Sequence, residues 1–415
     1  MPQRAPAAHN PGMETPASGA VLAPRLVTGA GETFAPGGLA WEDGLLAYVG
    51  AADGLAAEAR SVSGAVIPGF VDCHTHLPFV GWRADEFEAR LFGRTYRDLQ
   101  GGGGGIYRSS RLFAAARDEE VLAFCEPLLA EMLLHGTTAL ELKTGYGLSV
   151  EAELRQARFA RALSQRAAQT CTVTLLACHA VPPEIERADW VRIACDELIP
   201  SAAAEGLVDA IDIYVEDIAF SLDDLSAVGE AAANAGLPLR VHADQLGASR
   251  AAEAAVRLGA RSADHLNHLS DAGVDALASG STTAVLLPAS TFFLRADPPP
   301  VKRLLESGAR VAIASDFNPG TSPTLSMPEV VAMACTLYGF TPTNAIVAAT
   351  SGGASVLGLS DRLGTLEPGK RADFLVLDSE EIAMVPYRFG HNPVSETYVA
   401  GVLVAGGSSR SSEPD

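Results

Sequence analysis

The sequence is poor in cysteine and contains no Cys-x-x-Cys pair. Its six cysteines are scattered over 415 residues, most of them within apolar stretches. A disulfide framework needs more cysteines at regular spacings, so this pattern argues against one. It favours a reducing compartment, and we therefore expect a cytoplasmic protein.

Basic residues and long apolar runs are also scarce. Thirty Lys and Arg face fifty Asp and Glu, which gives a formal net charge of −20 at pH 7. Such a chain repels nucleic acids and anionic membranes, so neither is an expected partner. No apolar run is long enough to span a bilayer. Residues 1–19 are rich in Pro, Ala and Gly without the apolar run of a signal peptide, and we expect a disordered tail there.

Apolar residues are plentiful, at 48% of the chain, which is enough for a large core. Residues 20–66 and 364–407 alternate short apolar runs with Gly and Asp turns, as in antiparallel strands. We predict that these two ends form one small, discontinuous β-sandwich domain. Residues 67–363 alternate short apolar strands with Ala-rich helical segments, which indicates repeated β-α units. Eight candidate strands predict an α/β fold, a (β/α)8 TIM-like barrel.

Polar residues cluster at the carboxyl ends of the predicted barrel strands, where the chemistry of such barrels is carried out. Five of the nine histidines and one aspartate occupy these ends: His74, His76, His179, His242, His265 and Asp316. Side chains two apart on a strand share a face, so His74 and His76 can converge on one ion. Alone, this pair could equally be two polar residues where a strand leaves the core.

The other strand ends favour a metal site. His242 and Asp316 complete a set of nitrogen and oxygen ligands that leaves a position open for water, as a catalytic metal needs. Zinc suits this set, and iron or manganese can be accommodated. In related barrels a modified lysine can bridge two metal ions. Lys143 lies near the end of the second predicted strand, which is the wrong strand for this role, so we predict a single ion. His179 and His265 could be core histidines, but their strand-end positions favour active-site roles.

The glycine run at 101–105 lacks the Lys-Ser/Thr sequence of a phosphate loop and predicts instead a flexible lid.

Several longer segments resemble the imidazolonepropionase family of the amidohydrolase superfamily. They are "GFVDCHTHLPFVGWRADEF", "ELKTGYGL", "CHAVPPE", "HADQL", "SADHLNHLS" and "SDFNPGTSPT", in order between about residues 20 and 405. The resemblance implies a barrel of the metal-dependent hydrolase type. It also implies hydrolysis of the cyclic amide 4-imidazolone-5-propanoate to N-formimidoyl-L-glutamate in histidine degradation, and a possible homodimer.

The resemblance also assigns site residues. It implies that His74, His76, His242 and Asp316 hold a zinc or iron ion. It implies substrate contacts at Arg83, Tyr146, His179 and Gln245, and product contacts at Asn318, Gly320 and Thr321. Some members of the family have Glu where this chain has Gln245, which puts proton removal by this position in doubt.

The residues themselves are consistent with a substrate that carries a carboxylate. Arg83 offers a bidentate partner shortly after the metal pair. The backbone of Gly320 and Thr321 can present N–H donors to a carboxylate. The alternatives are a surface salt bridge from Arg83 to Asp85 or Glu86, and a plain turn at 318–320.

These residues predict a hydrolytic mechanism. A divalent metal lowers the pKa of its bound water toward about 7. We expect Asp316 to take the proton of that water, and His265 or His179 to donate to the developing oxyanion. Asp316 or a histidine then returns a proton to the leaving nitrogen.

Two other functions are compatible with these residues. One is another cyclic amidohydrolase or a nucleobase-type deaminase, which would share the fold and the ligands. The other is a non-catalytic metal-binding homologue, which the presence of all four ligands disfavours.

Overall fold

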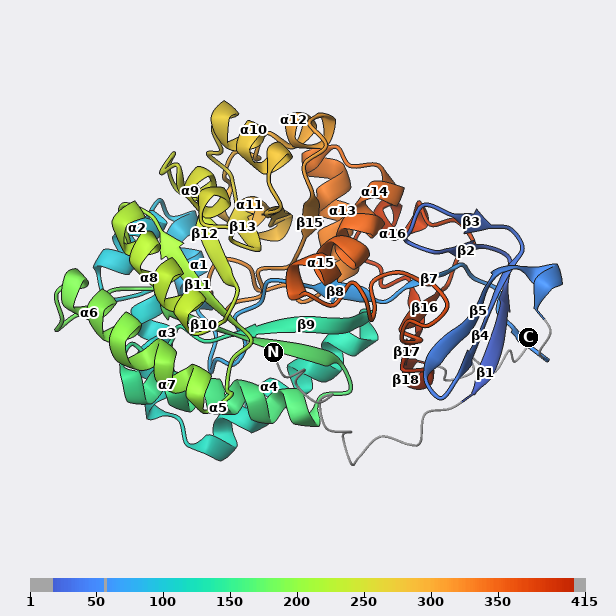
Figure 1. The fold of residues 1–415 in the computed structure, drawn as a ribbon, viewed down its shortest axis with the longest axis horizontal. Coiled ribbons are helices and arrows are strands. Elements are labelled where there is room, and N and C mark those ends of the chain that lie inside the picture. Colours follow the sequence, from blue (N-terminus) through green and yellow to red (C-terminus); the bar gives the residue numbers. More distant parts are fainter. Residues whose placement is uncertain (1–17, 56–57, 407–415) are drawn as a thin grey trace.

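The computed structural model describes residues 18–55 and 58–406. Residues 1–17 of the predicted tail therefore lie outside the described residues, and the first strand begins at Gly19, the last residue of that tail. Figure 1 shows a barrel surrounded by helices, with smaller sheets to one side of it. Among the described residues, no helix combines the length and the apolar character needed to cross a membrane.

Eight parallel strands form the barrel, and each pairs with the next one along the chain. They are β8 (Phe70–Asp72), β9 (Thr137–Lys143), β10 (Thr170–Cys178), β11 (Ala210–Val215), β12 (Leu239–Ala243), β13 (Ser262–His265), β14 (Thr283–Leu286) and β15 (Val311–Ile313). A parallel bridge between Thr75 and Phe317 joins the segments that follow β8 and β15, and so closes the ring. Seven of the strands are fully buried or nearly so, as expected where a barrel interior and helices cover both faces.

Helices connect the strands and cover the barrel. The connection after β8 contains α1 (Ala84–Leu91), α2 (Tyr96–Gly101), α3 (Ile106–Ala115) and α4 (Asp118–Leu134). The next connections contain α5 (Val150–Arg166), α6 (Arg187–Ile193), α7 (Ile199–Ala204), α8 (Leu222–Asn234), α9 (Ala251–Arg257) and α10 (Asp271–Ser279). The remaining helices are α11 (Pro288–Leu294), α12 (Val301–Glu306), α13 (Met327–Tyr338), α14 (Pro342–Val347), α15 (Gly353–Leu357) and α16 (Met384–Tyr387). Serine side chains cap the first turns of α5, α8, α10 and α13, which fixes where these helices begin.

The two chain ends build a pair of sheets beside the barrel, blue and red in Figure 1. One sheet has the order β5-β4-β1-β6, and the other has the order β18-β17-β16-β7-β2-β3. Their strands are β1 (Gly19–Ala23), β2 (Leu26–Val27), β3 (Thr33–Phe34), β4 (Gly37–Glu42), β5 (Leu45–Ala51), β6 (Arg60–Ser61), β7 (Val66–Pro68), β16 (Phe374–Leu377), β17 (Val394–Val399) and β18 (Val402–Gly406). A separate apolar cluster around Trp41, Phe374 and Tyr398 lies between the sheets. The predicted fold class is thus confirmed.

The first predicted barrel strand needs one correction. Residues 65–76 contain two short strands from different sheets, because β7 pairs with β16 and β8 pairs with β9. Gly69 lies between them, and a Cβ there would come within 2.1 Å of Thr138 Oγ1. The predicted boundary between residues 66 and 67 falls inside β7.

Candidate active site

The carboxyl end of the barrel brings the six predicted strand-end residues together. His74 and His76 follow β8, His179 follows β10, His242 lies within β12, and His265 ends β13. Asp316 follows β15, and both His265 and Asp316 have a left-handed backbone, with φ of 78° and 54°. A non-glycine residue rarely takes this conformation, and such residues concentrate at functional sites.

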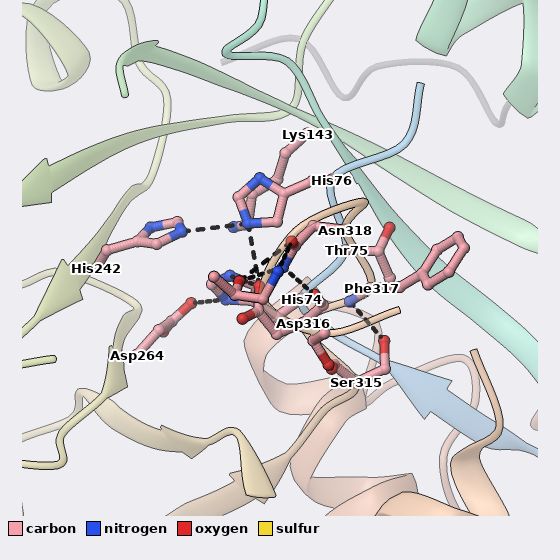
Figure 2. A network of polar contacts seen from close by, with 12 residues as sticks. His74, Thr75, His76, Lys143, His242, Asp264, Ser315, Asp316, Phe317 and Asn318 are labelled. Carbon is pink, nitrogen blue, oxygen red and sulfur yellow. Dashed lines mark hydrogen bonds and ion pairs between the residues drawn. The ribbon is translucent and has the colours of Figure 1, made fainter. Parts of the chain in front are cut away.

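The four predicted metal ligands converge in the buried interior of this end. His76 Nε2 lies 3.3 Å from Asp316 Oδ1 and 3.5 Å from His242 Nε2. His74 Nε2 lies 3.6 Å from the same Asp316 oxygen. Figure 2 shows the three imidazoles and the carboxylate turned toward one another.

This spacing fits a divalent metal ion. Two ligand atoms each about 2.1 Å from a tetrahedrally coordinated ion are about 3.4 Å apart. His74 Nε2 and Asp316 Oδ2 are also buried without a hydrogen-bond partner in the described part of the chain. Leaving such atoms unpaired is costly unless another group, such as an ion, satisfies them. Burial lowers the pKa of His74 and His76 well below the ordinary value, which favours the neutral form that binds metals.

Two aspartates contact the Nδ1 atoms of two ligand histidines and so orient their rings. Asp264 Oδ2 lies 2.6 Å from His74 Nδ1, and Asp212 Oδ1 lies 3.1 Å from His242 Nδ1. Contacts of this kind fix the tautomer and turn Nε2 toward the metal position. Burial raises the pKa of Asp264 to about 7. Asp212 and Asp264 were not among the predicted site residues. The signal for them is a carboxylate within a short, buried barrel strand.

Lys143 lies next to the ligand cluster and is ion-paired with two buried acids, Asp212 and Glu141. Its Nζ is 2.7 Å from Asp212 Oδ2 and 2.7 Å from Glu141 Oε2, with all three side chains fully buried. Burial opposes the ammonium charge, but Asp212 and Glu141 raise the pKa of Lys143 above its ordinary value. Arg240 forms a close ion pair with the other oxygen of Glu141. Lys143 is thus engaged in a buried ion-pair network.

A cavity opens above the metal ligands. It is lined by His76, Arg83, Ile106, Tyr146, His179, Tyr214, His242, Gln245, His265, Asp316, Asn318 and Thr321. Ten of these were predicted as site residues, whereas Ile106 and Tyr214 were missed because Ile106 begins a helix and Tyr214 lies within a mostly apolar strand, where neither stands out. Two predicted residues lie just outside the lining. His74, itself a predicted ligand, is fully buried and does not reach the cavity surface, and Gly320 lies against Arg83.

Arg83 is buried at this cavity and is no surface residue. Its Nε and Nη1 atoms have no hydrogen-bond partner among the described residues, and Glu86 Oε2 lies 3.7 Å from Nε. Asp85 pairs instead with Arg108, at 2.6 Å. The alternative of a surface salt bridge is therefore wrong for Asp85, and the contact with Glu86 is long. A buried guanidinium with unpaired donors can bind an anionic group.

The segment after Asp316 departs from the prediction. The N–H groups of Gly320 and Thr321 donate to Asn318 Oδ1, at 2.9 and 2.7 Å. The prediction that these two N–H groups are available to a carboxylate is therefore wrong, because the Asn318 side chain closes the turn on itself. Asn318 Nδ2 donates to the Asp316 carbonyl oxygen at 2.6 Å, which ties this turn to the metal-ligand segment.

The remaining predicted residues surround the cavity. The His179 ring stacks on that of His76, with centroids 5.2 Å apart, and its Nδ1 lies 3.0 Å from the carbonyl oxygen of Gly145. A carbonyl only accepts, so Nδ1 carries the proton; burial keeps the pKa of His179 well below its ordinary value, and Nε2 offers a lone pair. Burial likewise lowers the pKa of His265 to about 3. The Gln245 N–H donates to Glu216 at 2.7 Å.

His135 and His268 do not line the cavity. His135 ends α4, and His268 is exposed.

Comparison with known proteins identifies the class. Residues 65–404 match the model of the Amidohydrolase family, and the chain belongs to this family. The 5-methylcytosine deaminase from Klebsiella pneumoniae has a similar fold, with a TM-score of 0.74 and 17% identity, over 94% of this chain and 98% of that chain. The guanine deaminase from C. acetobutylicum has a TM-score of 0.67 and 16% identity, over 93% and 100%. At these identities the likeness shows the fold alone.

Sequence relatives narrow the family. The chain is 44% identical over 363 residues to the imidazolonepropionase of Cupriavidus pinatubonensis, which covers 85% of this chain and 86% of that protein. It is 44% identical over 344 residues to the imidazolonepropionase of Rubrobacter xylanophilus, covering 83% and 82%. The chain thus belongs to the imidazolonepropionases, and the predicted resemblance is confirmed. Family membership and the histidine cluster together indicate a metal-dependent hydrolase with a divalent ion.

Proposed function

We propose that this chain hydrolyses 4-imidazolone-5-propanoate to N-formimidoyl-L-glutamate, the reaction that the names of its relatives indicate. The observation that carries this proposal is that one cavity combines a cluster of metal ligands with a buried arginine. The four ligand atoms, each 3.3 to 3.6 Å from another, lie at or just behind its floor, and the buried Arg83, whose Nε and Nη1 have no hydrogen-bond partner among the described residues, lies at its wall. The first suits an attack on a cyclic amide, and the second suits a carboxylate tail.

His74, His76, His242 and Asp316 would hold a single ion, and zinc or iron suits these ligands. When bound, a divalent ion lowers the pKa of water toward about 7 and polarises an oxygen of the substrate. A second metal ion bridged to the first by a lysine is disfavoured, because Lys143 is already ion-paired with Glu141 and Asp212.

Three residues of the site, Asp316, His265 and His179, take different roles in proton transfer and hydrogen bonding. Asp316 is suited to accept the proton of the attacking water, since burial raises the pKa of its carboxyl. His265 is suited to donate to the oxyanion that forms at the ring carbonyl. His179 offers an unprotonated Nε2, so it is better suited to accept or relay a proton than to act as the oxyanion donor. Asp316 or His179 then returns a proton to the leaving nitrogen.

The substrate is oriented by the other residues of the cavity. Arg83 binds the propanoate carboxylate, and Tyr146, His179 and Gln245 contact the ring. Asn318 and Thr321 line the side where the ring-opened product forms, and Gly320 lies just behind them, against Arg83. Gln245 carries no charge, so its proposed role is hydrogen bonding without proton removal.

Product analysis tests this function against the nearest rival. Purified protein is incubated separately with imidazolonepropionate, cytosine, guanine and a hydantoin, and the products are identified by mass spectrometry. Loss of imidazolonepropionate with formation of N-formimidoyl-glutamate is the expected result. Ammonia release from a nucleobase, with imidazolonepropionate untouched, would instead establish a deaminase on the same scaffold.

We further propose a cytoplasmic location and a homodimer. The first rests on the six cysteines, all of them free. The second rests on the family resemblance alone, and light scattering of the purified protein at two concentrations tests it.

A further inference from the structure

The loop between β9 and α5 is held by two side chains of that helix. Glu153 accepts hydrogen bonds from the N–H groups of Gly145, Gly147 and Leu148, at 3.0, 2.7 and 3.0 Å. Gln156 Oε1 accepts from the N–H groups of Gly145 and Tyr146, at 3.1 and 2.9 Å. Every backbone N–H from residue 145 to residue 148 is therefore bound by one of these two side chains.

The start of the helix does not require this arrangement. Ser149 already caps α5, because its hydroxyl accepts from the N–H of Ala152 at 3.2 Å. Glu153 and Gln156 are fully buried, and a buried carboxylate is costly unless hydrogen bonds compensate for the lost water. The burial raises the pKa of Glu153, whereas the loop N–H groups oppose that rise. The loop and the carboxylate thus stabilise each other.

The loop and Gln156 are connected to three parts of the substrate cavity: Tyr146, His179 and the segment before Arg83. The loop contains Tyr146, which lines the cavity. The carbonyl oxygen of Gly145 holds His179 Nδ1 at 3.0 Å. Gln156 Nε2 donates to the carbonyl oxygen of Pro78 at 2.7 Å, in the segment between the metal ligand His76 and Arg83.

The tight fit of the loop leaves little freedom. A Cβ at Gly145 would lie 2.7 Å from His179 Nδ1, and a Cβ at Gly147 would lie 2.3 Å from the Glu153 nitrogen. The backbone of Gly145 also has φ of 115°, which favours glycine. The position of the loop is consequently restricted by close neighbours and by its hydrogen bonds to these two helix side chains.

We propose that Glu153 and Gln156 are positioning residues for substrate binding. Together they fix Tyr146 and His179 above the metal ligands and couple them to the segment that leads to Arg83. Neither side chain lines the cavity or lies among the metal ligands. The proposal rests on the proposed function for its kinetic consequences, but the loop contacts themselves do not depend on it.

Two nearly isosteric variants test the proposal. Glu153→Gln puts an amide N–H against a backbone N–H of the loop. Gln156→Glu keeps the acceptor for Gly145 and Tyr146 but opposes a carboxylate oxygen to the Pro78 carbonyl. Loss of a hydrogen bond to a charged group changes affinity by about tenfold or more, so we expect KM to rise about tenfold in Glu153→Gln. In Gln156→Glu the carboxylate repels the Pro78 carbonyl oxygen, and we expect KM to rise there as well. The metal content and the metal affinity should stay at the wild-type level.

The matched control is Glu253→Gln on α9. Glu253 is also buried near a helix N-terminus, where it pairs with Arg250 and Ser270, but it lies outside the cavity. The KM of the Glu253→Gln variant should be unchanged. Its unfolding temperature shows how much stability a buried Glu→Gln substitution costs outside the cavity. Amide hydrogen exchange adds a readout without substrate, because residues 145–148 should exchange faster in Glu153→Gln.

The outcomes separate the two proposals. Faster exchange with an unchanged KM in both variants would overturn the positioning role. Unchanged exchange would overturn the loop contacts themselves. If the wild-type protein leaves imidazolonepropionate intact, the proposed function fails, whereas exchange at residues 145–148 still decides whether Glu153 holds the loop.

Discussion

Replacing Gly320 with alanine should displace Arg83 without altering the metal ligands. A Cβ at Gly320 would lie 1.6 Å from Arg83 Nη2 and 2.3 Å from Arg83 Cζ. No real contact is that short, so the guanidinium must move. The backbone of Gly320 lies outside the left-handed region, so alanine adds no backbone strain of its own. The substitution therefore acts on one side chain.

The magnitude follows from what Arg83 loses. A hydrogen bond to a charged group contributes about 1.5 to 3 kcal/mol, which corresponds to about 10- to 150-fold in affinity. Arg83 is 3% exposed, so solvent screens its contact with a substrate carboxylate only weakly. We expect KM for imidazolonepropionate to rise by about that factor, with a smaller change in kcat.

Steady-state kinetics from the absorbance decay of the substrate measures this change. Lys302→Ala is the control, since the Lys302 side chain is exposed on α12 and lies outside the cavity lining. It should leave KM unchanged. A wild-type KM in Gly320→Ala would refute the assignment of Arg83 to the carboxylate. A fall in kcat alone would indicate that the displaced side chain disturbs the metal site instead.

Three further substitutions probe the buried interior. Asp316→Asn removes a metal ligand and proton acceptor, and turnover should fall by orders of magnitude with the circular dichroism spectrum unchanged; near-normal turnover would contradict this role. Asp264→Asn weakens the orientation of His74 and should lower metal affinity about 10- to 100-fold in a chelator competition, and an unaltered affinity would count against it. Lys143→Met leaves Asp212 without its lysine and Glu141 with Arg240 alone, and should cost about 3 to 5 kcal/mol in urea unfolding, whereas an unchanged midpoint would show that the ion pairs of Lys143 contribute little.

The strand-end rule explains why so much of the site was predictable. Parallel barrel strands end at one rim, so polar residues that directly follow apolar strands must lie near one another. This reasoning brought together His74, His76, His242 and Asp316 from segments far apart in the chain. It also gave the number and order of the barrel strands, because alternation of strands and helices leaves few other topologies.

What the sequence did not reveal depends on contacts between strands. Asp212 and Asp264 lie within strands, and their use as partners for ligand histidines depends on the register between neighbours. The split of residues 65–76 into two strands depends on which sheet each half joins. The turn at Asn318 was predicted to present free N–H groups, but whether a side chain fills its own turn is decided by its rotamer.

Titration of the metal into chelated enzyme tests the central claim most directly. The apoenzyme receives zinc or ferrous ion in fractions of an equivalent, while the absorbance of imidazolonepropionate is followed and the bound metal is measured. The four-ligand site predicts no turnover in the apoenzyme and a linear recovery that saturates at one ion per chain. Full activity after verified metal removal, or saturation at two ions per chain, would contradict it.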